Sequence, residues 1–119
     1  PGARLVLTDA RRREVYWAVY DGGRRTAGPD VSAPDALVAE LSGVDLTGVV
    51  GETRFTERFG FVGSELVTPT AASLVSVAAP EILSSAPTEP LAPLYLRRPD
   101  AVELKDQKRK SLLPAATND

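Results

Sequence analysis

The sequence predicts an α/β domain in which helices pack on a mixed β-sheet. Three short segments with strand character, joined by tight turns, occupy residues 5–27. Helical and strand-like segments then alternate along the chain to about residue 79. Strands joined by short turns form antiparallel pairs, and alternation of helices with strands adds layers to a sheet. The 119 residues suit one hydrophobic core.

The first two strands are expected to form a hairpin. Residues 5–8 are an apolar strand, residues 9–13 form the turn, and residues 14–20 are a strand with an aromatic centre. Apolar side chains occupy both faces of this second strand, so we expect both faces of the sheet to be covered. Trp17 is then a core residue.

A third strand and a helix follow. Asp-Gly-Gly at residues 21–23 is a turn, because glycine adopts a positive φ without steric cost. The next strand covers about residues 24–27. Pro29 cannot donate to a strand ladder, so the strand ends there or lies at a sheet edge. Ser32 is the expected helix N-cap, and Pro34 suits the first turn.

The middle of the chain continues this alternation. The first helix should end at Gly43, and its apolar face carries Leu37, Val38 and Leu41. Residues 46–51 read as a short buried strand. Phe55 and Phe59 stand four residues apart, which indicates one short helix.

Residues 65–67 are expected to form another strand, and residues 68–70 should begin a helix. That helix should kink or restart at Pro80, which lacks an N–H. Its apolar positions are Ala71, Leu74, Val75 and Ala78. Residues 94–96 either add an edge strand or lie over the core, and we expect Tyr95 to pack on the sheet rather than to stack a base.

The composition excludes several kinds of chemistry. Cysteine and histidine are both absent, which removes disulfides, thiolate zinc sites and imidazole bases. The net charge of −2 gives no overall basic field for nucleic acid. No apolar run is long enough to span a bilayer, so the cytoplasm is the expected compartment. Glu52 and Glu57 have no accompanying base or metal ligands, so no catalysis is assigned to them.

Two runs carry a specific resemblance. Asp-Ala-Arg at residues 9–11 with Glu-Val-Tyr-Trp at 14–17, and Pro-Leu-Tyr-Leu-Arg at 93–97, resemble the second half of the bacterial TsaB (YeaZ) family. The resemblance implies one domain of an actin-like ATPase and sugar-kinase (ASKHA) fold, over residues 1–96. Since such proteins have two domains, a preceding domain is expected, although a trimmed terminus or a tag scar would also explain the start.

The resemblance also implies where a nucleotide would bind. In active relatives of this fold, the first hairpin wraps a phosphate, which requires glycines. Here that turn holds Asp9, Arg11 and Arg12 and no glycine, and only Gly51 stands in the second nucleotide-binding region. We therefore expect a degenerate site and no bound cofactor. Asp9 could be a metal or phosphate carboxylate, but an Asx turn is the preferred interpretation.

Residues 97–119 are predicted to be a charged, mobile tail. It contains the candidate tRNA or partner contacts Arg97, Arg98, Lys105, Lys108, Arg109 and Lys110. Contact with tRNA there would be directed at the RNA backbone and salt-sensitive, because aromatic residues are not interleaved. A solvated terminus is the preferred interpretation.

The family resemblance implies a non-catalytic scaffold subunit. Its partners would be a TsaD-like catalytic subunit and a TsaE-like ATPase, which transfer threonylcarbamoyl to the adenosine beside the tRNA anticodon. The metal and the chemistry would belong to the TsaD-like subunit, and tRNA would be met through the complex. Two alternatives stay open: an enzyme, either a glycoprotease-like peptidase or an ASKHA-type kinase, and a plain self-associating homodimer.

Overall fold

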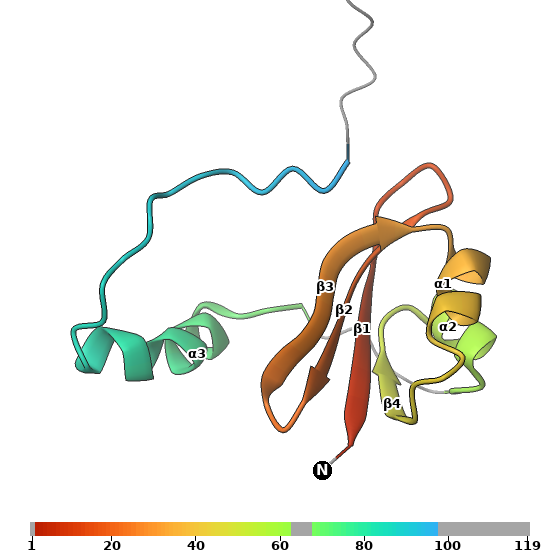
Figure 1. Ribbon diagram of the computed structural model, residues 1–119, viewed down its shortest axis with the longest axis horizontal. Helices are drawn as coiled ribbons and strands as arrows, with labels where there is room; N and C mark the ends of the chain where they lie inside the picture. The colour runs from red at the N-terminus through yellow and green to blue at the C-terminus, as the bar shows by residue number, and fades with distance from the viewer. Residues whose placement is uncertain (1, 63–67, 98–119) are drawn as a thin grey trace, which may run out of the picture.

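The computed structural model describes residues 2–62 and 68–97 (Figure 1). Four strands form one mixed sheet in the order β3-β2-β1-β4. The strands are β1 (Ala3–Asp9), β2 (Val15–Asp21), β3 (Arg24–Ser32) and β4 (Leu46–Val50). β1 and β3 both pair with β2 in antiparallel fashion, and β4 lies parallel to β1. The predicted α/β class with a mixed sheet is confirmed.

Short helices cover one face of this sheet. They are α1 (Pro34–Glu40), α2 (Thr53–Thr56) and the 3₁₀ turn η1 (Glu57–Phe59). Leu5 on β1 is fully buried and aligns with Val19 on β2 and Val49 on β4. Alternate side chains of a strand share a face, so these positions define the core side. The core cluster consists of Leu5, Leu7, Val15, Trp17, Val19, Leu37, Leu41, Val49 and Phe55.

Trp17 is a core residue, as predicted, with 5% of its surface exposed. Its indole Nε1 donates a hydrogen bond to Ser32 Oγ at 3.0 Å. This bond explains why α1 begins differently from the prediction: Ser32 stays in β3, and Ala33 takes the N-cap position without a side-chain cap. The helix ends at Glu40, before a turn that contains Gly43.

β3 is longer than predicted and runs through Pro29 to Ser32. A proline is tolerated there because β3 is an edge strand, which was one of the two predicted outcomes. The pairing of β2 with β3 is irregular around Val19. Gly28 lies at this irregularity with a φ of 75°, and a Cβ there would lie 2.7 Å from the Trp17 carbonyl oxygen. The close approach of the two strands therefore requires glycine.

The second face of the sheet is more open than predicted. Thr8 and Tyr16 are exposed on it, while Val6 and Tyr20 are half-buried. The expectation that both faces would be covered is therefore wrong for the part of the chain that the structure describes. The apolar residues on this face come from β1 and β2, and the periodicity of a strand does not reveal whether anything packs on it.

The helix α3 (Ala71–Leu83) starts with a capping box between Thr70 and Ser73. It continues through Pro80, so the predicted restart did not occur. None of its residues is buried, and Figure 1 shows it beside the sheet domain rather than on the sheet. Its large apolar side chains are exposed; these are Leu74, Val75, Val77, Ile82 and Leu83.

The chain after α3 is extended. Residues 94–96 form no strand, and Tyr95 is 80% exposed, so its predicted packing on the sheet is wrong. Leu94 and Arg97 nevertheless border a hollow of about 260 Å³ against Tyr16 of β2. The predicted strand at 65–67 and the tail from Arg98 onward lie outside the described residues.

Candidate functional site

A cavity of about 600 Å³ lies where β1 ends and the β1–β2 turn begins. Three parts of the chain meet there, because β4 runs parallel to β1 and leads directly into α2, while β3 leads into α1. The lining residues are Asp9, Arg11, Arg12, Arg13, Ala33, Pro34, Asp35, Arg54, Phe55 and Arg58. The candidate site is thus lined mainly by arginine and aspartate.

The turn after β1 is closed by its own hydrogen bonds. Asp9 Oδ1 accepts a bond from the Arg11 N–H at 2.8 Å, which forms the predicted Asx turn. The Ala10 N–H donates to the Glu14 carbonyl at 3.0 Å, and the Glu14 N–H donates to the Arg11 carbonyl at 3.0 Å. Three backbone donors of this turn are therefore already paired.

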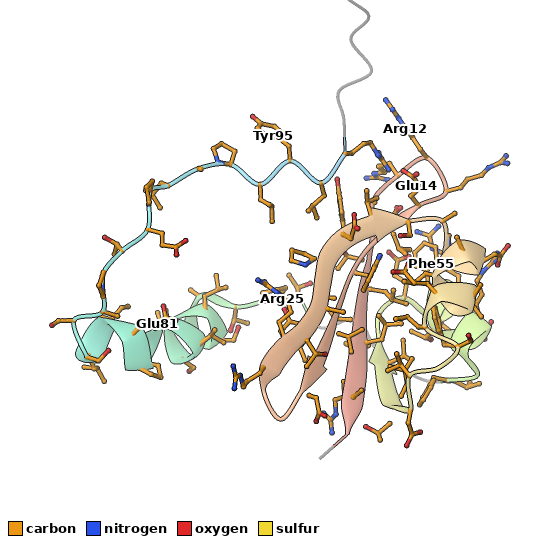
Figure 2. All side chains as sticks on the ribbon, in the orientation of Figure 1. Arg12, Glu14, Arg25, Phe55, Glu81 and Tyr95 are labelled. Atoms are coloured by element: carbon orange, nitrogen blue, oxygen red, sulfur yellow. The ribbon has the colours of Figure 1, made fainter. Side chains whose placement is uncertain are left out.

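Three consecutive arginines adopt the left-handed conformation in this turn. The φ angles of Arg11, Arg12 and Arg13 are 63°, 53° and 62°. This region costs a residue with a Cβ about 1–2 kcal/mol, and glycine or asparagine occupies it more readily. The backbone directs the three exposed side chains outward, and Figure 2 shows Arg12 projecting from the tip of the turn.

Arg54 connects α2 to the turn. Its Nη2 lies 3.2 Å from Asp9 Oδ2, and its Nε donates to Glu52 Oε2 at 2.7 Å. The guanidinium also lies over the Phe55 ring, 4.4 Å from its centre. The hydrogen bond to Glu52, joined by the charges of Glu52 and Asp9, raises the pKa of Arg54.

The carboxylate of Asp9 is held in its ionised form. The backbone hydrogen bond from Arg11 lowers the pKa of Asp9, and the charges of Arg54 and Arg11 act in the same direction. A second acidic side chain of the cavity, Asp35, pairs with Arg58. Each carboxylate thus fixes a guanidinium at the rim without neutralising the whole cluster.

Gly51 has a packing role and does not line the cavity. It is buried at the end of β4, where a Cβ would lie 2.9 Å from the Leu7 carbonyl oxygen and 3.0 Å from Leu7 Cβ. The β4–α2 junction can lie this close to β1 only because residue 51 lacks a side chain.

The two runs that carry the family resemblance meet beside this site. Arg97 forms an ion pair with Glu14 through its Nη2. The same nitrogen lies 3.5 Å from the Arg11 carbonyl oxygen. The Pro93–Arg97 run is thereby joined to the first hairpin, 83 residues earlier in the sequence.

The structure brings together Asp9, Arg11 and Arg12 in the cavity and places Arg97 next to it. The remaining predicted contacts, Arg98, Lys105, Lys108, Arg109 and Lys110, lie outside the described residues. Sequence reasoning missed Arg54 and Arg58. Arg54 lies in α2 and Arg58 in the 3₁₀ turn η1 that follows it, and only the parallel pairing of β4 with β1 brings these two elements to the turn.

Residues 2–62 and 68–97 contain no cluster of acidic residues suited to a metal ion. In the same residues, no helix has the length and apolar character needed to cross a membrane.

The chain is similar to mycobacterial proteins. A protein of Mycobacterium leprae named as uncharacterized is 48% identical over 100 residues, which are 84% of this chain and 26% of the relative. An uncharacterized protein of Mycobacterium tuberculosis is 42% identical over 103 residues, 87% of this chain and 45% of the relative, and a Mycobacterium bovis protein gives the same values. The chain therefore spans less than half the length of these relatives. No protein-family model matches it.

Proposed function

We propose that the chain is the second ASKHA-type domain of a TsaB-like scaffold subunit. The subunit would act in the transfer of threonylcarbamoyl to the adenosine beside the tRNA anticodon. The observation that carries the proposal is the contact of Arg97 with Glu14, because it joins the two runs on which the family resemblance rests. The matched segment is 45% of the M. tuberculosis relative, a length that leaves room for one further domain of this size, whereas the M. leprae relative, of which it is 26%, is longer.

The non-catalytic role is supported by the hairpin turn. A phosphate loop needs free backbone N–H groups and glycines that let the ligand approach closely. Here the N–H groups of Ala10, Arg11 and Glu14 are paired within the turn. Gly51 packs closely against Leu7 and does not line the cavity. The metal and the transfer chemistry would then belong to a TsaD-like partner, with a TsaE-like ATPase as third component, in the cytoplasm.

The proposal is tested by measuring the threonylcarbamoyladenosine content of tRNA. We expect that deleting the gene in its own organism lowers threonylcarbamoyladenosine in total tRNA, as measured by mass spectrometry of digested tRNA. The intact gene should restore it, and transfer by purified TsaD-like and TsaE-like proteins should require the complete gene product. A deletion strain with unchanged tRNA modification would contradict the proposal.

An ASKHA-type kinase is the enzyme alternative, and ATP binding discriminates it. Calorimetry of the chain with Mg-ATP should show no binding in the micromolar range, which corresponds to about −8 kcal/mol. A saturable isotherm in that range would favour the kinase.

Self-association is the second candidate function, and the exposed apolar surface of α3 favours it. The helix has thirteen residues and a single charged side chain, Glu81, so two copies would meet with little charge repulsion. Sedimentation equilibrium should then show a dimer that Leu74→Glu and Val77→Glu abolish. A monomer at millimolar concentration would remove this candidate.

A further inference from the structure

We propose that the cavity at the β1–β2 turn, called the arginine cavity below because Arg11, Arg12, Arg13, Arg54 and Arg58 line it, binds the phosphate backbone of RNA. Five of its ten lining residues are arginines and two are aspartates, and Glu52 pairs with Arg54 beside them, so these eight charged side chains carry a net charge of +2. The whole chain has a net charge of −2. Positive charge is therefore concentrated at one end of the sheet, where it would attract a polyanion that the rest of the molecule repels.

The cations at this site remain accessible. The side chains of Arg11, Arg54 and Arg58 are 89%, 59% and 48% exposed. Arg13 is exposed as well and forms no ion pair with any described residue. Asp9 and Asp35 hold Arg54 and Arg58 at the rim, and a planar guanidinium held in this way keeps N–H groups for a phosphate oxygen.

The turn conformation points to a role for the side chains themselves. Arg11 and Arg13 occupy left-handed positions that glycine or asparagine would fill with less strain. The strained backbone turns these arginines toward solvent beside Arg54, so that one surface is formed from segments more than 40 residues apart.

An extended RNA backbone fits this site better than a mononucleotide. Three backbone donors of the turn, the N–H groups of Ala10, Arg11 and Glu14, are already paired within it, which leaves fewer N–H groups to enclose a terminal phosphate. Phe55, the one aromatic residue of the lining, is only 8% exposed and offers no stacking surface for a base. Binding would therefore depend on phosphate contacts, without base specificity. The choice of RNA over an acidic peptide rests on the proposed function, in which tRNA is the substrate.

The experiment measures binding of the full chain to an unmodified tRNA transcript from 50 to 300 mM salt. The test variant is Arg11→Gln with Arg13→Gln, and Arg58→Gln is a second, independent variant. The control is Arg24→Gln with Arg25→Gln, which removes the same charge from exposed residues at the start of β3, where they pair with the last residues of β2. Thermal melting of each variant confirms that it is folded.

Two lost phosphate contacts should lower the slope of log affinity against log salt by roughly 1.5 units. The control should change the slope by less than a third of that, and Arg58→Gln should give about half the effect of the double variant. If the control variant lowered this slope as much as the test variant does, the proposed RNA site would be refuted. Tighter binding of a poly-glutamate peptide than of tRNA, or displacement of tRNA by micromolar ATP, would also refute it.

These outcomes can be separated from failure of the proposed function. If the arginine variants lose tRNA binding while the deletion strain retains normal tRNA modification, the RNA site is supported and the proposed function is contradicted. If the deletion strain loses modification and the chain shows no arginine-dependent binding to tRNA, the function stands and the RNA site is refuted.

Discussion

Asp9 organises the arginine cavity through two different contacts. One carboxylate oxygen accepts the Arg11 N–H and shapes the turn, while the other meets Arg54 from α2. The first contact joins residues only two positions apart, so it can be predicted from the sequence, in which an aspartate stands at the start of a turn. The second contact spans 45 residues and depends on how β4 returns beside β1. The Asx turn could therefore be predicted from the sequence around Asp9, whereas the contact of Asp9 with Arg54 could be found only from the three-dimensional structure.

Asp9→Asn should make unfolding less sensitive to acid. Folding lowers the pKa of Asp9, so its ionised form stabilises the fold at pH values above the usual aspartate range, about 4. That stabilisation decreases as the pH falls through the folded-state pKa. Asparagine keeps the acceptor for the Arg11 N–H and removes only the charge. The variant should therefore melt below the parent at pH 7 and match it near pH 2.

The matched control is Asp45→Asn, which changes an exposed aspartate between α1 and β4. It removes one carboxylate charge from the surface without touching the contacts of Asp9, and its melting temperatures at pH 7 and pH 2 serve as the baseline for that charge change. If Asp9→Asn behaves like this control, the contacts of Asp9 with Arg11 and Arg54 do not affect stability.

At the level of elements, sequence patterns located the strands more reliably than they located the surfaces that the elements bury. Tight turns and alternating residues were sufficient for β1, β2 and the start of β3, because both signals are local. The same patterns failed for Tyr95, for α3 and for the open face of the sheet. Apolar residues at a given spacing indicate that a surface can be buried, but they do not specify what packs against it.

Trp17 joins the elements of the core, and its truncation should be severely destabilising. Trp17→Ala removes a large side chain that is 5% exposed and should cost about 3–5 kcal/mol in the free energy of unfolding. Ser32→Ala instead leaves the indole N–H without its acceptor on β3, which should cost about 1 kcal/mol. Urea unfolding followed by circular dichroism measures both effects. Equal stability of Trp17→Ala and the parent would contradict the core role of Trp17.

For the whole molecule, the hydrophobic core is confined to the first of the two described stretches, residues 2–62. Its buried cluster extends from Leu5 to Phe55, and the partly buried residues packed against it end at Phe61. α3 adds no buried residue. The described contacts that connect the later chain to the sheet domain include the ion pair of Arg97 with Glu14, whose side chains are 24% and 35% exposed. Partly exposed pairs contribute little, about 0–1 kcal/mol.

A chain ending at Val62 should therefore fold by itself. It retains every residue of the core cluster and should unfold cooperatively, with a free energy of unfolding within about 1 kcal/mol of the full chain. Both values should be small, since a domain of about 60 residues buries a modest fraction of its surface. Arg97→Gln in the full chain isolates the loss of the ion pair and should account for most of the difference. Urea unfolding of the three proteins makes the comparison. An unfolded truncated chain, alongside a stable Arg97→Gln variant, would contradict this prediction and show that the sequence after Val62 supports the sheet through more than the ion pair of Arg97 with Glu14.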